Sequence, residues 1–129
     1  MTDPGEVVAA FIAAVERKDI EAAAAMLADD VSYENVPIAP IVGRDAARAT
    51  LEAFLGPAEE VDWPVRRQVV SGRHVFNERL DRFRLDGGWL ELPVAGVFEV
   101  DDTGSITLWR DYFDMATYTR QLEALTGNG

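Results

Sequence analysis

From about residue 62 onward, apolar and polar side chains alternate with a period of two residues. This spacing places successive side chains on opposite faces of a β-strand. It predicts strands over roughly 62–71, 74–85, 89–100 and 105–114. The segments Asp86-Gly87-Gly88 and Asp101-Asp102-Thr103-Gly104 favour tight turns between the last three strands. The alternation therefore constrains the second half of the chain to an antiparallel sheet.

The first half of the chain shows helical spacing instead. Asp3, Pro4 and Glu6 form the capping pattern of a helix N-terminus, and an apolar stripe follows them. Further helices are predicted over 20–27, from Gly43 to Gly56 and over 115–125, with a short strand over 31–36. Helices followed by antiparallel strands are typical of an α+β fold, in which the helices lie against a curved sheet and leave a conical apolar pocket. Because no repeat or linker appears, we predict a single domain over residues 1–129.

Charged residues interrupt the apolar faces of two predicted strands. Arg79 and Asp81 share a strand face with Phe83, and Asp111 shares one with Trp109. A charge held among apolar groups is costly unless it is paired. An Arg-x-Asp pair in a strand is often only a surface ion pair, but the apolar neighbours favour a buried functional site here.

These charges are suited to acid–base chemistry. The guanidinium of Arg79 can hold the carboxyl groups of Asp81 and Asp111 together. The neutral arrangement then has one carboxyl protonated and the other ionised, which provides a general acid and a general base in one pocket. Tyr33 and Asn35 fall on one face of the short strand. They fit an ordinary strand end, or a phenol and a carboxamide that hold a water molecule beside an ionised aspartate.

Composition narrows the classes of partner. The formal net charge is −11, which argues against nucleic acid or an anionic membrane surface as a partner. The chain has no cysteine, so thiolate chemistry is excluded. No phosphate loop or metal-ligand spacing appears, and we predict neither a metal nor a cofactor. The absence of a long apolar segment and of a leader-like start predicts a cytoplasmic protein with no membrane partner.

Several short motifs occur together along the chain. They are Tyr33-x-Asn35-x-Pro37, Gly43-Arg44-Asp45-Ala46, Arg79-x-Asp81, Gly96-Val97-Phe98 and Trp109-Arg110-Asp111-Tyr112-Phe113-Asp114. In order and spacing, from about Val7 to Tyr118, they resemble the limonene-1,2-epoxide hydrolase family. The element order also resembles the nuclear transport factor 2-like, or cystatin-like, cone, a fold that hosts many unrelated functions.

This resemblance implies that water opens an epoxide in one step, without a covalent enzyme intermediate. In the family pattern, Asp111 deprotonates the water that Tyr33 and Asn35 help to hold. Asp81 protonates the epoxide oxygen, and Arg79 bridges the two aspartates. The residues by themselves leave open which aspartate is the acid. The resemblance also implies a homodimer formed through the outer face of the sheet.

The expected substrate is a small, hydrophobic epoxide, which reacts with water. Apolar side chains that share faces with the candidate acids, or come from the first and last helices, are predicted to form the pocket walls: Ile12, Val15, Phe83, Leu92, Val94, Phe113 and Tyr118. Each of these residues also fits plain core packing.

Two other functions fit the same fold. One is a polyketide cyclase or ketosteroid-type isomerase, which needs an acid–base carboxylate and an oxyanion donor. Those reactions do not call for an arginine between two acids. The other is a non-catalytic small-molecule binding module in which the buried charges form only a structural network.

Overall fold

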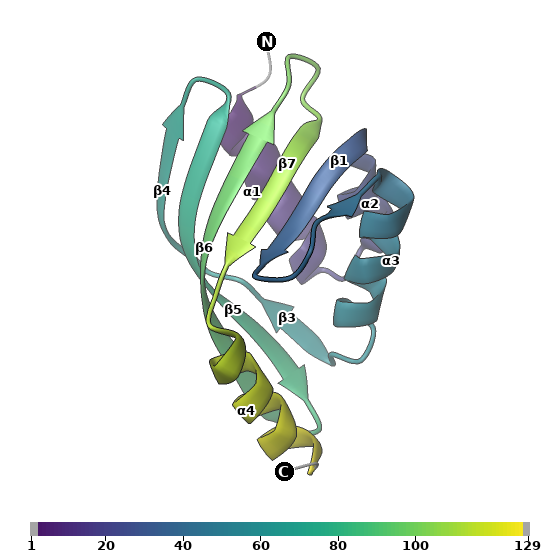
Figure 1. The fold of residues 1–129 in the computed structure, drawn as a ribbon, viewed down its shortest axis with the longest axis vertical. Helices are drawn as coiled ribbons and strands as arrows, with labels where there is room; N and C mark the ends of the chain where they lie inside the picture. Colours follow the sequence, from purple (N-terminus) through teal and green to yellow (C-terminus); the bar gives the residue numbers. More distant parts are fainter. Residues whose placement is uncertain (1–2, 128–129) are drawn as a thin grey trace.

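Figure 1 shows the computed structural model, which describes residues 3–127. In chain order its elements are α1 (Pro4–Glu16), α2 (Ile20–Ala25), β1 (Leu27–Val36), β2 (Ile41–Val42), α3 (Arg44–Leu55), β3 (Glu60–Asp62), β4 (Val65–Ser71), β5 (His74–Leu85), β6 (Gly88–Val100), β7 (Ile106–Tyr112) and α4 (Met115–Thr126). Helix α1 passes behind the sheet, α3 lies beside β1 and β2, and α4 lies at the end away from the N-terminus (Figure 1).

The strands form one curved sheet in the order β2-β1-β7-β6-β5-β3, and β4 also pairs with β5. Strand β1 runs parallel to β7, whereas the other pairings among the described residues are antiparallel. Strand β5 is long enough to pair with β4 over residues 74–79 and with β3 over residues 82–84. The β1–β7 pairing places the first strand of the chain beside the last one, which proves decisive for the site.

The predicted helix start at Asp3 is confirmed, and Asp19 caps the second helix in the same way. The Asp3 carboxylate accepts hydrogen bonds from the backbone N–H groups of Gly5 and Glu6, and that of Asp19 accepts one from Ala22. Such caps satisfy N–H groups that have no partner within the helix. Before α3, Gly43 has a φ of 103°, a conformation that favours glycine.

The core lies between the sheet and helices α1, α2 and α3. Phe11 from α1 packs edge-on against Trp109 of β7, with ring centroids 4.9 Å apart, and Phe98 of β6 stacks near the same indole. Helix α3 buries Ala47, Leu51 and Leu55. Helix α4 buries none of its residues fully. No helix within residues 3–127 is both long and apolar enough to cross a membrane.

Several boundaries differ from the predictions. The strand predicted over 62–71 is two strands, β3 and β4, separated by Trp63-Pro64, because proline has no N–H to donate to the ladder. Strand β1 begins at Leu27, so α2 ends at Ala25. A register shift between Leu27 and Ser32 obscures the alternation there. The two-residue strand β2 is too short to leave a periodic signal.

Candidate active site

Strand β5 presents three polar side chains toward the core. Asn77, Arg79 and Asp81 alternate along its inward face, and Asp111 faces inward from β7. The side chains of Arg79, Asp81 and Asp111 are 0%, 5% and 6% exposed. The predicted burial of these charges is confirmed.

Arg79 joins the two acids directly. Its Nε and Nη2 donate to Oδ1 and Oδ2 of Asp81, both at 2.9 Å, which is the two-pronged geometry that arginine favours with a carboxylate. The same Nη2 donates to Oδ2 of Asp111 at 2.9 Å. Nη1 donates to Oδ1 of Asn77 at 3.0 Å. The guanidinium also lies 5.1 Å from the ring centroid of Trp63, so an aromatic face covers it.

Gly96 makes this bridge possible. It lies on β6 between the other two strands and pairs with Asn77 of β5 on one side and with Asp111 of β7 on the other. A Cβ atom at this position would lie 2.4 Å from Nη1 of Arg79 and 3.0 Å from Oδ1 of Asp111. The missing side chain therefore leaves the space through which Arg79 reaches from β5 to β7.

Aromatic contacts fix the other side of Asp111. Nε1 of Trp109 donates to its Oδ1 at 3.1 Å. Tyr33 stacks on the Trp109 ring, with centroids 4.0 Å apart and planes 8° apart. The parallel register pairs Tyr33 with Trp109 and Asn35 with Asp111. The β1–β7 pairing thus brings Tyr33 and Asn35, more than seventy residues away in the sequence, next to the acid on β7.

The buried charges change one another's proton affinity. Burial raises the pKa of Asp81 from 3.8 to about 6; Arg79 opposes the increase and Asp111 adds to it. Burial would lower the pKa of Arg79, but the two aspartates outweigh it and raise that pKa, so the guanidinium stays cationic. Burial, with a contribution from Asp111, also raises the pKa of Tyr33, so its hydroxyl keeps its proton at neutral pH.

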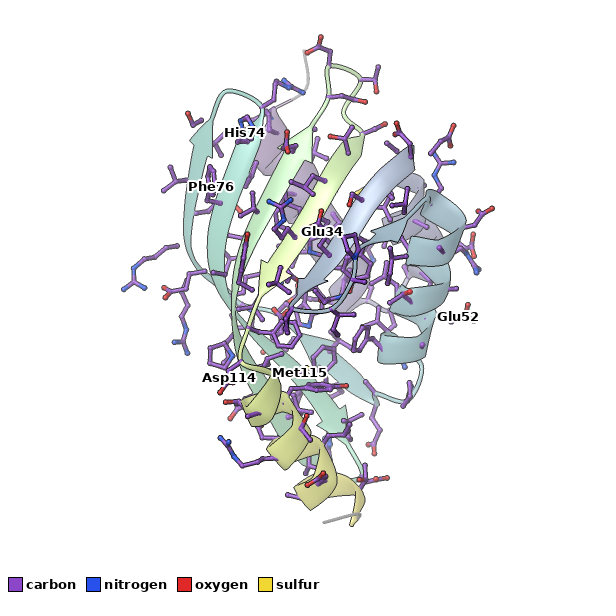
Figure 2. All side chains as sticks on the ribbon, in the orientation of Figure 1. Glu34, Glu52, His74, Phe76, Asp114 and Met115 are labelled. Atoms are coloured by element: carbon purple, nitrogen blue, oxygen red, sulfur yellow. The ribbon has the colours of Figure 1, made fainter. Side chains whose placement is uncertain are left out.

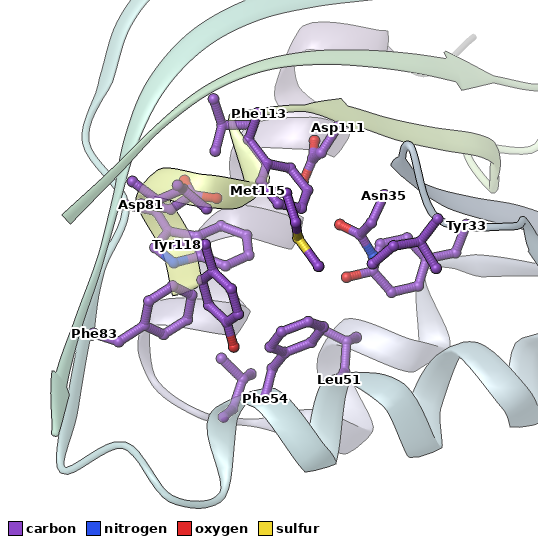
Figure 3. Close-up of a pocket in the computed structure, with 15 residues that line it drawn as sticks. Tyr33, Asn35, Leu51, Phe54, Asp81, Phe83, Asp111, Phe113, Met115 and Tyr118 are labelled. Atoms are coloured by element: carbon purple, nitrogen blue, oxygen red, sulfur yellow. The ribbon is translucent and has the colours of Figure 1, made fainter. Parts of the chain in front are cut away.

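A cavity opens in front of these groups, between the sheet and helices α3 and α4 (Figure 3). Asp81, Asp111, Tyr33 and Asn35 supply its polar side chains from different sides, whereas Arg79 is not among the lining residues. The remaining wall is almost entirely apolar or aromatic: Ile38, Leu51, Phe54, Leu55, Trp63, Phe83, Leu92, Val94, Phe113, Met115 and Tyr118. The empty space, counted together with the solvent in its open mouth, is ≈ 550 Å³.

Five of the seven predicted wall residues line this cavity: Phe83, Leu92, Val94, Phe113 and Tyr118. The other two, Ile12 and Val15, do not line it, and their placement as pocket walls is wrong. Both belong to the hydrophobic core. Ile12 also lines a separate groove. Trp63 lines both this groove and the cavity, so it lies between the two spaces.

Sequence reasoning missed the contribution of α3 and of the β3–β4 connection to the wall. Leu51 and Leu55 of the helix predicted from Gly43 to Gly56 line the cavity, but an apolar helical stripe does not distinguish a core from a cavity. Trp63 lies within the segment 62–71, which the alternation predicts as one continuous strand, so the connection that carries it into the wall is not predicted. Among residues 3–127 no group of three or more metal-ligating side chains could hold a metal ion.

Comparison with known proteins identifies the family. A sequence model of the limonene-1,2-epoxide hydrolase catalytic domain matches residues 2–124. The chain belongs to this family. Epoxide hydrolase EphG of Mycobacterium tuberculosis (strain ATCC 25618 / H37Rv) is 38% identical over 108 residues, which cover 84% of this chain and 71% of that protein. As a member of the limonene-1,2-epoxide hydrolase family, the protein is an enzyme, an epoxide hydrolase.

Solved structures agree with this assignment. A limonene-1,2-epoxide hydrolase-like epoxide hydrolase of M. tuberculosis superposes with a TM-score of 0.79 at 35% identity, covering 96% of this chain and 95% of that one. A putative SnoaL-like polyketide cyclase from Shewanella putrefaciens CN-32 gives a TM-score of 0.84 at 16% identity, covering 96% and 98%. The second likeness shows the fold alone. The predicted α+β cone of the nuclear transport factor 2-like type is confirmed.

Proposed function

We propose that this epoxide hydrolase adds water to a hydrophobic epoxide in one step and gives a vicinal diol without a covalent intermediate. The observation that carries the proposal is the position of Arg79, whose Nη2 lies 2.9 Å from both Asp81 and Asp111. One cation between two buried carboxyl groups favours a state in which one carboxyl is protonated and the other ionised. An acid and a base are thus held at one cavity wall.

Asp111 acts as the base in this mechanism. Trp109 and Arg79 each hold one of its oxygens, which leaves the carboxylate little freedom to turn. Tyr33 and Asn35 line the cavity beside it and hold the attacking water. A water fixed by a phenol, a carboxamide and a carboxylate points a lone pair at the substrate, and such positioning lowers the barrier.

Asp81 acts as the acid. The water oxygen bonds to one epoxide carbon while the bond between that carbon and the epoxide oxygen breaks. The epoxide oxygen takes the proton of Asp81, and Asp111 takes a proton from the water. A pKa near 6 leaves Asp81 partly protonated near neutral pH, as a general acid requires. The proton must then return from Asp111 to Asp81 before the next turnover, and Arg79 contacts both.

The substrate is a cyclic or terpene-like epoxide with few polar groups. Apart from the four polar side chains and the Tyr118 hydroxyl, the wall offers hydrocarbon and aromatic surface. Burial of apolar substrate surface against such a wall supplies most of the binding free energy.

The test is diol formation by the purified enzyme from a panel of cyclic and terpene epoxides that includes limonene 1,2-epoxide. Asp81→Asn and Asp111→Asn should each abolish activity while remaining folded. Glu78→Gln is the matched control, because Glu78 lies on the same strand but is exposed on the opposite face. Near-wild-type activity of either aspartate variant would refute the assignment of these residues.

The alternatives predict different outcomes. An isomerase or cyclase would exchange deuterium at a substrate's enolisable carbon and leave epoxides untouched. A binding module would keep or gain stability when Arg79, Asp81 and Asp111 are all replaced by apolar side chains of similar size, because paired buried charges contribute little net stability. We expect neither result.

We also propose that the enzyme is a homodimer formed through the outer face of the sheet. The strand registers place Val69, Phe76, Val97 and Arg110 in one row across β4, β5, β6 and β7. Phe76, which is labelled in Figure 2, lies on the face of the sheet away from α1. Val69 and Phe76 are exposed there. Light scattering coupled to size-exclusion chromatography should give twice the chain mass, and Phe76→Glu should lower it to the monomer mass.

A further inference from the structure

The Nη1 group of Arg79 has a partner that the proposed mechanism does not use. Arg79 donates from Nε and Nη2 to the two aspartates, while Nη1 donates to Oδ1 of Asn77 at 3.0 Å. Asn77 is 4% exposed. Its Nδ2 in turn donates to Oε1 of Gln68 on β4 at 3.3 Å. A chain of side-chain hydrogen bonds therefore runs from the sheet edge to the guanidinium.

Position 77 has narrow chemical requirements. Its side chain must accept a hydrogen bond from a buried cation, yet a third carboxylate would disturb the charge balance of one cation and two acids. A carboxamide accepts without carrying charge. Gly96 lies opposite Asn77 in the register, and a Cβ there would lie 2.9 Å from the Asn77 oxygen and 2.4 Å from Nη1 of Arg79. The amide and the guanidinium thus share the space that Gly96 leaves open.

We propose that Asn77 is a positioning residue for the hydrolysis: it fixes the plane of the Arg79 guanidinium so that Nη2 contacts Asp81 and Asp111 at once. Its role rests on the function proposed above. Asn77 does not line the cavity and so does not contact substrate. Without it, Nη1 would be buried with no acceptor at this position, a costly state that the guanidinium would relieve by turning. A rotation of the guanidinium plane that gave Nη1 a new acceptor would move Nη2 away from Oδ2 of Asp111.

The proposal predicts a separation of kinetic constants. Asn77→Leu removes the acceptor at similar volume, so kcat should fall by about 10- to 100-fold while KM changes by less than about twofold, because only the alignment of the catalytic groups is lost. Val75→Ala is the control, since Val75 is buried two residues earlier on the same face of β5 and outside the cavity wall. It should lower stability and leave kcat per folded molecule unchanged.

Asn77→Asp gives a second, independent readout. It keeps the acceptor and adds a negative charge on the guanidinium that Asp81 also binds. The charged or titratable neighbours of Asp81 come from four elements: Arg79 on β5, Asp111 on β7, Tyr33 on β1 and Glu16 on α1. The added charge should raise the pKa of Asp81 by about one unit or more. The alkaline limb of the kcat profile should move to higher pH by the same amount.

The deciding experiment combines kinetics with a carboxyl ¹³C NMR titration of Asp81 in the wild type and in Asn77→Asp. A loss of kcat at constant KM in Asn77→Leu, together with a raised Asp81 pKa in Asn77→Asp, supports the proposal. Wild-type kcat in Asn77→Leu, or an unchanged Asp81 titration in Asn77→Asp, overturns it. If the wild type hydrolyses no epoxide, the proposed function fails, and the NMR titration still decides whether Asn77 sets the state of the Arg79 cluster.

Discussion

Replacing Gly96 with alanine tests the geometry of the site with a single methyl group. The new Cβ would lie 2.4 Å from Nη1 of Arg79, and Nη1 must retreat by about 1 Å before the distance reaches the 3.4 Å of an ordinary contact. The bonds from Arg79 to the two aspartates are 2.9 Å long. A shift of that size takes at least one of them beyond hydrogen-bonding distance.

The expected loss follows from these distances. Misplacing catalytic groups by about 1 Å can cost roughly 100-fold in rate, so kcat of Gly96→Ala should fall about 100-fold. Overpacking a filled site costs about 1–3 kcal/mol, and the free energy of unfolding should fall by that amount. The backbone adds no strain, because Gly96 lies outside the left-handed φ region.

Initial rates of diol formation and urea unfolding measure the two effects. Gly88→Ala is the control on the same strand: its Cβ would lie 2.3 Å from Cδ2 of Leu125, the end of a flexible side chain remote from the charges. That variant should keep its kcat. A folded Gly96→Ala enzyme with wild-type kcat would refute the idea that β6 must leave room for Arg79.

Four further outcomes are expected. Because the proposed mechanism needs a protonated Asp81, kcat/KM should decline as pH rises through about 6; a flat profile from pH 5 to 8 would contradict the acid role. The same raised pKa means that the folded state binds this proton more tightly than the unfolded state. The contribution of Asp81 to the unfolding free energy, measured in urea as the difference between the wild type and Asp81→Asn, should therefore rise by up to about 3 kcal/mol as pH falls from 7 to 4. Tyr33→Phe keeps the ring stacked on Trp109 but removes the hydroxyl, so kcat should fall by about 10- to 100-fold with unchanged thermal stability, and equal kcat would argue against a water contact. Arg79→Met leaves two buried acids without their cation and should lower the free energy of unfolding, measured in urea, by about 3–5 kcal/mol. This loss should be smaller at low pH, where protonated acids no longer need the cation.

The two-residue alternation of side chains predicted the buried position of the charged residues. It placed Arg79, Asp81 and Asp111 on inward faces because a strand has an exact two-residue repeat, and the structure confirms their burial. The same repeat placed Asn77 on that face, but a neutral side chain gives no charge signal. The role of Gly96 depends on which residues neighbour it across three strands, and pairing registers between distant strands are not encoded in local spacing.

Helical periodicity was less informative about the cavity. The stripe on α1 predicted inward-facing Ile12 and Val15, and both are buried, but they contact the core and do not reach the cavity. Met115 and Phe54 line the cavity because α4 packs against β6 and brings Tyr118 edge-on to Phe54 of α3, an arrangement set by tertiary packing. The distinction between acid and base also lay outside the sequence pattern, since each aspartate shares a strand face with an aromatic side chain, Phe83 for Asp81 and Trp109 for Asp111.

One measurement tests the one-step mechanism most directly: a single turnover in ¹⁸O-labelled water with enzyme in excess over substrate. If water held by Tyr33, Asn35 and Asp111 attacks the epoxide, the diol from the first turnover carries the label and the protein carries none. If a carboxylate attacks instead, the first diol contains unlabelled oxygen, and the label appears in Asp81 or Asp111 when the ester is hydrolysed. The arrangement of the site predicts the first result, and the second would contradict it.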